Sequence, residues 1–208
     1  MSDQPARRVS RRGRRDTRSE LQGRLSAALE DLVADGQTYS GLSVELLVDR
    51  AGIARSTFYK YFGDKRGLLL ALSDEVQADF LAAAAVLLDL PPEATREDYR
   101  AAFRAVFAGY RRHRVAMWSL SEEARHDPAV AERFGRMMDG FVEAIAAHIG
   151  RVWSGRDDGN PGTVAVWLTW MLEDGQARFV ARADEAALER HLAAAAEIVW
   201  RAVHIEAP

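Results

Sequence analysis

Residues 41–72 read GLSVELLVDRAGIARSTFYKYFGDKRGLLLAL and contain two short helical patterns with a glycine between them. The first pattern opens at Ser43, a residue type that caps helix N-termini, and closes at Gly52, which adopts positive φ without strain. The second runs from near Ala54 to Phe62, about 12 Å at 1.5 Å per residue. Two short helices joined by a tight turn predict a helix-turn-helix.

The second of these helices has two different sides. Phe58 and Phe62 lie about 40° apart on a helical wheel and define the side that packs inward. The other side carries hydroxyl groups, an amine and aromatic rings: Ser56, Thr57, Tyr59, Lys60 and Tyr61. Hydroxyls and lysine contact phosphates or base edges in a major groove, and an aromatic ring packs on a thymine methyl. The pattern predicts a helix that reads DNA.

A longer helical pattern precedes this pair of helices. Its apolar residues recur every three or four positions from Thr17 onward, and Gly36 closes it. They are Leu21, Leu25, Ala28, Leu29, Leu32 and Val33. We therefore expect a three-helix DNA-binding domain over residues 17–64.

Charge is distributed unevenly along the 208 residues. Residues 1–70 hold 13 Lys and Arg against 9 Asp and Glu, a net charge of +4, whereas residues 71–208 hold 15 against 22, a net charge of −7. Most of the positive excess lies in ARRVSRRGRRDTR, residues 6–18. This segment has almost no apolar residues to pack, so composition predicts a disordered basic arm over residues 1–16. Such an arm is either a solvated tail or a DNA contact.

Composition limits the class of protein. The 48% of hydrophobic residues can build a core, and no run approaches the roughly 18–20 apolar residues that span a bilayer. The N-terminus also lacks the apolar segment of a signal peptide, so a cytoplasmic location without a membrane partner is expected. Since the chain has no cysteine, disulfides and thiolate metal sites are excluded.

The rest of the chain reads as helices. Thr95 with Asp98, Asp127 before Pro128, and Asn160 before Pro161 are typical helix starts. Helices are expected at about 67–90, 95–111, 114–125, 128–153, 161–182 and 184–204. No alternating strand pattern occurs. The predicted fold is therefore all-α, with about nine helices.

The segment 41–72 resembles the helix-turn-helix motif of the TetR family of bacterial transcriptional regulators. The residues that match are Ser43, Ala51, Gly52, Ile53, Thr57, Tyr59, Tyr61, Phe62, Asp64 and Lys65. The resemblance implies an effector-binding and dimerisation domain over residues 65–208. It also implies a repressor that binds a double-stranded, palindromic DNA operator as a homodimer and is released by a small molecule.

The outward side of the helix from Ala54 to Phe62 and the resemblance to the TetR family together assign the DNA contacts. They are Ser43, Arg55, Ser56, Thr57, Tyr59, Lys60, Tyr61 and Lys65, with Arg11, Arg12, Arg14 and Arg15 of the arm entering a minor groove or gripping phosphates. Arg55 suits bidentate contact with guanine. The wheel turns it toward the buried side, but as a first-turn residue it can still splay outward. Glu45 departs from members with a basic residue there, and it either reads a cytosine amine or avoids the DNA. Val48 replaces a usual alanine, which affects packing only.

Aromatic and methionine residues recur at helical spacing in the middle of the chain. They are Tyr99, Phe103, Phe107, Tyr110, Trp118, Met137, Met138, Phe141 and Trp170, with Thr169 or Tyr110 as polar anchors for a ligand. Such stripes usually form a core. The chain also resembles a mycobacterial subgroup of the family whose effector pocket is a long, largely apolar tunnel, which implies that these residues line a pocket for an elongated apolar or amphipathic ligand.

The last two expected helices carry apolar stripes that serve either their own core or a dimer. In TetR-like proteins these helices pair with their symmetry mates in a four-helix bundle. The resemblance thereby assigns the interface to Val164, Trp167, Leu168, Met171, Leu188, Leu192, Ala195 and Val199. Two recognition helices on a two-fold axis would read a palindrome.

The sequence also bears on three other functions. Glu123-x-x-His126 matches half of a di-iron site, but no second such pair, phosphate loop or nucleophile elbow occurs, so no catalytic residue, metal or cofactor is expected. A protein that coats DNA without reading it is compatible with the basic arm. An activator would use the same residues as a repressor.

Overall fold

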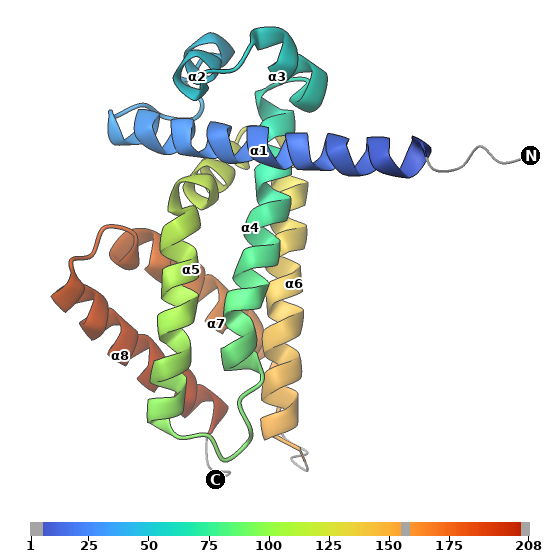
Figure 1. Cartoon of the computed structure of the whole chain (residues 1–208). Coiled ribbons are helices and arrows are strands. Elements are labelled where there is room, and N and C mark those ends of the chain that lie inside the picture. Colours follow the sequence, from blue (N-terminus) through green and yellow to red (C-terminus); the bar gives the residue numbers. More distant parts are fainter. Residues whose placement is uncertain (1–5, 155–158, 205–208) are drawn as a thin grey trace, which may run out of the picture. The chain divides into compact units, whose positions relative to one another are not determined.

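The chain is helical throughout the part that its computed structural model describes, residues 6–154 and 159–204, with side chains from Arg18 onward (Figure 1). The helices are α1 (Ala6–Ala34), α2 (Val44–Ala51), α3 (Arg55–Phe62), α4 (Lys65–Leu88), α5 (Arg96–Glu123), α6 (Pro128–Val152), α7 (Pro161–Gly175) and α8 (Glu185–Val203). A π-helical segment, η1 (Gln176–Val180), follows α7 directly. No strand occurs in these residues, so the all-α prediction is confirmed, with eight α-helices where about nine were expected.

One of the expected breaks does not exist. The sequence predicts separate helices over 95–111 and 114–125, whereas α5 is continuous from Arg96 to Glu123. The charged residues at the expected break serve the polar side of the helix instead. His113 Nε2 lies 3.0 Å from Asp79 Oδ2, and Arg114 donates to the Arg111 carbonyl. With no proline or glycine between 111 and 114, nothing ends the helix there.

The predicted helix starts have the expected caps. Ser43 Oγ accepts the N–H of Leu46 at 3.1 Å. Thr95 and Asp98 form a reciprocal box, in which the Thr95 N–H donates to Asp98 Oδ2 at 2.8 Å and the Asp98 N–H donates to Thr95 Oγ1 at 3.3 Å. Asp127 Oδ1 accepts two N–H groups from the first turn of α6. Local side-chain chemistry therefore sets where these helices begin.

Helix α1 starts well before the predicted position. We expected a helix from Thr17 and a disordered arm over residues 1–16, but α1 begins at Ala6. Arginine is a good helix former, and lengthening an existing helix adds one hydrogen bond per residue without a new nucleus. The side chains of Arg11, Arg12, Arg14 and Arg15 lie outside the described residues.

The chain forms two compact units. The first comprises Met1–Glu75 and Val115–Ala131, and the second comprises Val76–Arg114 and Glu132–Pro208. This division differs from the boundary expected after residue 64, because the first part of α4 belongs to the first unit. Gln22 of α1 fixes it there by donating to the α4 backbone.

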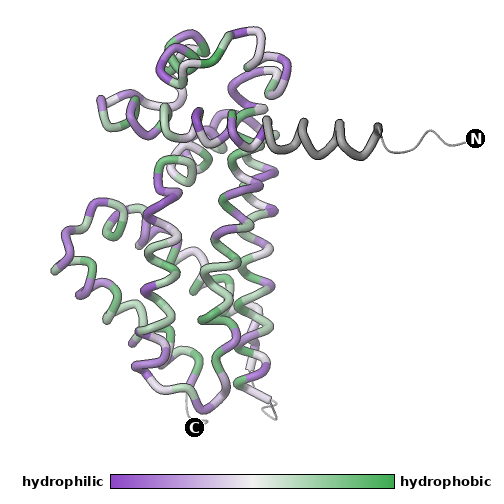
Figure 2. Tube along the Cα trace, viewed as in Figure 1, coloured by the Kyte–Doolittle hydropathy of each residue, from purple (hydrophilic) through white to green (hydrophobic). Residues whose placement is uncertain are grey.

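Amphipathic helices build the core of each unit. Figure 2 shows hydrophobic and hydrophilic residues alternating along the helices, turn by turn. In the second unit, buried side chains of α5, α6, α7 and α8 form one hydrophobic cluster. A buried pair of polar side chains lies in this unit: the Tyr99 hydroxyl and His148 Nε2 are 2.7 Å apart, and His148 Nδ1 is 3.0 Å from the Leu88 carbonyl oxygen. Because a carbonyl only accepts, Nδ1 carries the proton and Nε2 accepts from Tyr99. Burial lowers the pKa of His148 and raises that of Tyr99 to about 12, so both groups are neutral.

Candidate nucleic-acid interface

The turn between α2 and α3 is held by α1. Gly52 adopts the left-handed conformation, with φ 62°, and its N–H donates to the carbonyls of Asp49 and Val48. Arg24 of α1 donates to the Ala51 carbonyl through Nη2 at 2.7 Å and Nε at 3.1 Å, and Nη2 also donates to the Gly52 carbonyl. A Cβ at position 52 would lie 3.1 Å from that guanidinium. Glycine therefore suits this position because of its positive φ, and a Cβ would also press on the Arg24 guanidinium.

Lys65 at the start of α4 holds the turn before α2. Its Nζ donates to three carbonyl oxygens, those of Tyr39 at 2.9 Å, Ser40 at 3.2 Å and Leu42 at 2.7 Å. The Tyr39 hydroxyl donates back to the Lys65 carbonyl at 2.5 Å. Burial raises the pKa of Tyr39, so its hydroxyl keeps its proton, and burial lowers the pKa of Lys65 while two nearby glutamates oppose that shift. We call this arrangement the Lys65 clamp.

The outward side of α3 is the one that the wheel predicts. Phe58 and Phe62 are buried and their ring centroids lie 5.6 Å apart. The other residues of α3 are exposed or half-buried: Arg55, Ser56, Thr57, Tyr59, Lys60 and Tyr61. The Tyr59 ring is 41% exposed, which is unusual for so large a side chain in a folded unit. An exposed face of hydroxyls, one amine and rings on a short helix suits a major groove.

Arg55 splays outward, as a residue of the first turn can despite its position on the wheel, and it is already paired. Its side chain is 58% exposed, and its Nη1 lies 2.5 Å from Glu45 Oε1 of α2. Its Cζ lies 5.5 Å from the Tyr59 ring centroid, and Nη2 is 3.4 Å from the Tyr59 hydroxyl. The hydrogen bond to Tyr59 and the charge of Glu45 raise the pKa of Arg55. Contact with guanine would require Arg55 to leave Glu45.

Glu45→Gln should strengthen binding to DNA of arbitrary sequence about three- to tenfold. The substitution frees Arg55 for a phosphate and removes a negative charge from the face that meets the DNA. The slope of log affinity against log salt concentration should steepen by the amount expected for about one additional phosphate contact. Anisotropy titrations at several salt concentrations measure this slope. Glu20→Gln, which removes an exposed carboxylate from α1, is the matched control. Unchanged affinity in Glu45→Gln would mean that Arg55 does not approach the DNA.

Other predicted DNA contacts have different positions. Ser43 Oγ accepts the helix-capping bond, but its hydroxyl hydrogen can still donate to a phosphate. The contact predicted for Lys65 does not fit the structure, because the clamp uses all three N–H bonds of the ammonium. In the free chain Lys65 positions the motif, and a phosphate contact would require its ammonium to leave one of these carbonyls.

Most of the predicted effector residues are packed side chains of the second unit. Tyr99, Phe103, Phe107, Tyr110, Met137, Met138, Phe141 and Thr169 are buried. Trp118 and Trp170 are 40% and 45% exposed, and Trp118 belongs to the first unit. The structure does have a cavity of about 320 Å³ in the second unit, but among the predicted residues only Phe107 lines it.

The predicted dimer residues divide into two groups. Leu168, Leu192 and Val199 are buried in the core of their own unit, and Val164, Leu188 and Ala195 pack against it. Trp167 and Met171 are exposed. The exposed apolar residues of α7, η1 and α8 are Val166, Trp167, Trp170, Met171, Phe179 and Ile198, which we call the α7–α8 apolar face.

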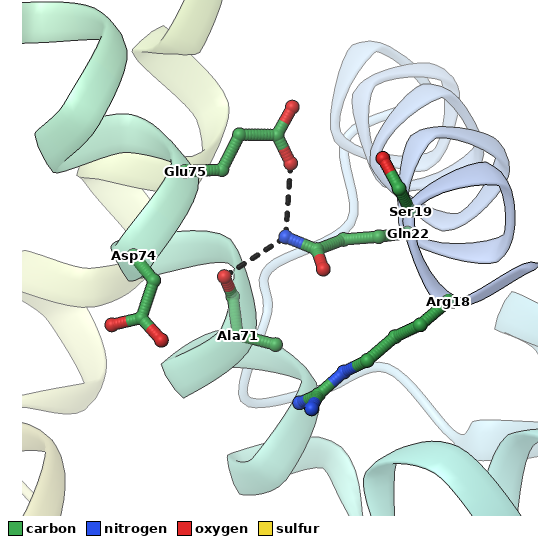
Figure 3. Close-up of a pocket in the computed structure, with 6 residues that line it drawn as sticks. All are labelled: Arg18, Ser19, Gln22, Ala71, Asp74 and Glu75. Atoms are coloured by element: carbon green, nitrogen blue, oxygen red, sulfur yellow. Dashed lines mark hydrogen bonds between the residues drawn. The ribbon is translucent and has the colours of Figure 1, made fainter. Parts of the chain in front are cut away.

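A second cleft of about 320 Å³ lies in the first unit and is polar (Figure 3). Gln22 Nε2 lies at its centre and donates to the Ala71 carbonyl and to Glu75 Oε2, each at 2.9 Å. Arg18 and Ser19 of α1 and Asp74 of α4 complete the lining. These bonds fasten α1 to α4, so the cleft is part of the support beneath the helix-turn-helix.

Sequence reasoning missed the residues that position the motif. Arg24 lies on the polar side of α1 and looks like any exposed charge in the sequence. The partner of Arg24 lies 27 positions later in the chain and depends on tertiary packing.

The helix-turn-helix matches a known domain. The sequence model described as "Bacterial regulatory proteins, tetR family" matches residues 25–72, from the second half of α1 to the first turns of α4. The chain belongs to the TetR family. The matched residues include the Lys65 clamp and the whole outward side of α3. In this TetR-family chain, the exposed side of α3 therefore lies within the domain that the family shares.

The relatives of this TetR-family chain carry regulatory names. The HTH-type transcriptional regulator EthR of Mycobacterium tuberculosis (strain CDC 1551 / Oshkosh) is 32% identical over 144 residues, 66% of this chain and 65% of that protein. EthR of Mycolicibacterium smegmatis is 26% identical over 140 residues, 66% of this chain and 64% of that protein. The chain therefore spans slightly less than two thirds of the length of these curated relatives.

Solved structures share the fold. The TetR family transcriptional regulator PfmR from Thermus thermophilus has a TM-score of 0.67 at 18% identity, covering 88% of this chain and 99% of that one. A TetR-like transcriptional regulator from Rhodococcus sp. RHA1 has a TM-score of 0.63 at 22% identity, covering 89% and 97%. Within the described residues, none of the helices combines the length and apolar character that crossing a bilayer requires.

Proposed function

We propose that this chain is a transcriptional repressor that binds a palindromic DNA operator as a homodimer and is released by a small, largely apolar molecule. The observation that carries the proposal is the exposed side of α3, which keeps polar and aromatic groups outward over a buried pair of phenylalanines. The regulatory names of the EthR relatives support it and speak against an enzyme. A protein acting on chromosomal DNA would work in the bacterial cytoplasm.

In the proposed complex α3 lies in the major groove. Ser56 and Lys60 contact phosphates or base edges, and the Tyr59 ring packs on a thymine methyl. Arg55 exchanges Glu45 for guanine where the operator offers one. The cost of breaking that ion pair would be offset only at the right base, which adds sequence discrimination.

The α7–α8 apolar face supports dimer formation. Trp167 is 75% exposed and belongs to a face whose six apolar side chains are all open to solvent in one protomer. Monomeric proteins rarely leave a large apolar patch uncovered. A second copy would cover it and bring two recognition helices to one palindrome.

Helix α4 supplies a route for release. It begins with the Lys65 clamp in the first unit and continues to Leu88 in the second, without a break in the helix. A ligand that binds one arrangement of the second unit better than another would shift α4 and with it the recognition helices. A ligand with equal affinity for both arrangements would change nothing.

Operator binding is tested with fluorescence anisotropy on the DNA flanking the chain's own gene and on a scrambled duplex of equal length, over a salt series. We expect at least hundredfold tighter binding to the flanking DNA at physiological salt. Tyr59→Ala should abolish this preference while dimer size and melting temperature stay unchanged, because Tyr59 is exposed. Tyr59→Phe, which keeps the ring, should retain most of it.

The alternatives predict different results. Equal, salt-sensitive binding to both duplexes that is lost on deleting residues 1–16 would indicate a protein that coats DNA through its basic arm. A preference that survives Tyr59→Ala would contradict the assignment of α3 as the recognition helix. An activator would bind the same operator but raise transcription in a purified polymerase assay, where we expect inhibition.

A further inference from the structure

One carboxylate lies at the edge of the α7–α8 apolar face. Glu173 follows Trp170 by three positions and Val166 by seven, so the three side chains lie along one stripe of α7. Trp170 and Val166 are open to solvent, whereas Thr169, one turn before Glu173, is buried. Glu173 itself is half-buried. It therefore lies at the boundary between the core of the second unit and the apolar face.

The Glu173 carboxylate has no counter-ion in its own protomer. Within the described residues, no hydrogen bond or ion pair reaches it. The nearby cation, Arg178, is paired with Asp174, whose Oδ2 accepts from Arg178 Nε at 2.7 Å. The Thr169 hydroxyl does not help either, because its Oγ1 is buried without a hydrogen-bond partner. An unpaired carboxylate in a partly buried position is uncommon, because burial favours the uncharged form.

The charges around Glu173 act in the same direction as burial. Burial raises the pKa of Glu173, the neighbouring Asp174 carboxylate raises it further, and Arg178 opposes both. From α5, Tyr110 faces this group, and burial and then the charges of Glu173 and Asp174 raise the pKa of the Tyr110 hydroxyl. Tyr110 therefore stays neutral and supplies no charge to balance Glu173.

We propose that formation of the homodimer takes up a proton at Glu173, so that acid strengthens the association of two copies. The inference rests on the proposed dimer and deepens it, because it names a condition that regulates the interface. A second copy on the α7–α8 apolar face would remove water from the open side of the carboxylate. A charged carboxylate without a counter-ion loses more on burial than a neutral carboxyl group does. The dimer therefore binds the proton more tightly than the separate copies, and lower pH favours it.

The dimer dissociation constant at two pH values tests the inference. Sedimentation equilibrium on the full chain without DNA should give a constant at least about tenfold lower at about pH 5.5 than at about pH 8, because one pKa unit corresponds to a factor of ten. Glu173→Gln keeps the shape and removes the charge. At about pH 8 this variant should associate at least about tenfold more tightly than the unmodified chain, and its constant should change less than about threefold with pH.

Glu143→Gln is the matched control. Glu143 is an exposed carboxylate of α6 in the same unit, outside the α7–α8 apolar face. Its loss changes the net charge of the chain by the same amount as Glu173→Gln. The Glu143→Gln variant should keep the pH dependence of the unmodified chain, so a general effect of net charge is separated from a specific effect at Glu173.

The sign of the pH dependence separates Glu173 from a histidine on the same face. The His191 ring of α8 stacks on Phe179, with 5.5 Å between ring centroids. A proton gained by His191 would add a positive charge to each apolar face and weaken the dimer at low pH. Tighter association in acid therefore does not come from His191.

A dimer whose constant does not change with pH would overturn this inference and leave the proposed dimer intact. So would a pH dependence that persists in Glu173→Gln. Association that weakens in acid would also overturn it and would indicate that Glu173 pairs with a cation of the second copy. Monomers at every pH would overturn both this inference and the proposed dimer, so the two failures are distinguishable.

Discussion

Lys65→Met will destabilise the first unit by about 2–3 kcal/mol and lower its melting temperature by about 10 °C. The ammonium donates to three carbonyl oxygens of the turn that leads into α2, at 2.7 to 3.2 Å. Methionine has a similar length and fills the same space, but it donates nothing. All three carbonyls would lose the ammonium; the Tyr39 carbonyl would keep only the Leu42 N–H at 3.2 Å, and the Leu42 carbonyl would lose its contact in a site that is only partly open to water. Thermal unfolding followed by circular dichroism measures the change.

Lys60→Met is the matched control for the Lys65 clamp. Lys60 lies on the exposed side of α3 and has only the Tyr61 ring near its Nζ, at 5.6 Å. Loss of the Lys60 amine should leave the melting temperature within about 1 °C. It should weaken DNA binding and lower the salt dependence of that binding by the amount expected for about one phosphate contact. The two lysines, which lie close together in the sequence, should therefore affect different measurements. A Lys65→Met variant that melts like the unmodified chain would contradict the clamp.

The helix-turn-helix was predictable because its information is local. Ser43 caps its own helix through a residue three positions on, and Gly52 fixes a turn by its own backbone. The period of four between Phe58 and Phe62 identifies the buried side of α3 without knowledge of the rest of the chain. For these features the sequence and the structure agree residue by residue.

The partners of long side chains were not predictable in the same way. Lys65 seemed suited to a phosphate, yet it bonds to carbonyls 23 to 26 positions earlier in the chain. The wheel turned Arg55 inward, whereas a flexible side chain in the first turn reaches Glu45 on another helix. Periodicity gives the direction of Cβ, but tertiary packing decides where the charged end of a long side chain lies.

The cavity was beyond sequence reasoning for a different reason. An aromatic stripe has the same pattern whether it fills a core or lines a pocket, and here Tyr99, Phe103 and Tyr110 are packed. The space lies beside Gln176, where η1 departs from α-helical geometry. That departure has no periodic signal in the sequence.

Trp167→Glu will convert the proposed dimer to monomers and weaken operator binding at least hundredfold. Trp167 is the most exposed side chain of the α7–α8 apolar face, and a carboxylate there would lose its hydration on dimer formation without gaining a partner. Each monomer would then read half of the palindrome, and the advantage of joining two binding events would be lost. Sedimentation velocity measures the mass, and anisotropy on the operator measures the affinity.

Val86→Glu provides the control for this substitution. Val86 is an exposed apolar residue of α4 in the same unit, 57% exposed, and it lies outside the α7–α8 apolar face. The Val86→Glu substitution adds the same negative charge as Trp167→Glu, so general effects of that charge on DNA binding occur in both variants and cancel in the comparison. Both variants should keep the melting temperature of their monomeric fold. Dimers that persist in Trp167→Glu would place the interface elsewhere, and monomers that still bind the operator tightly would show that recognition needs only one copy.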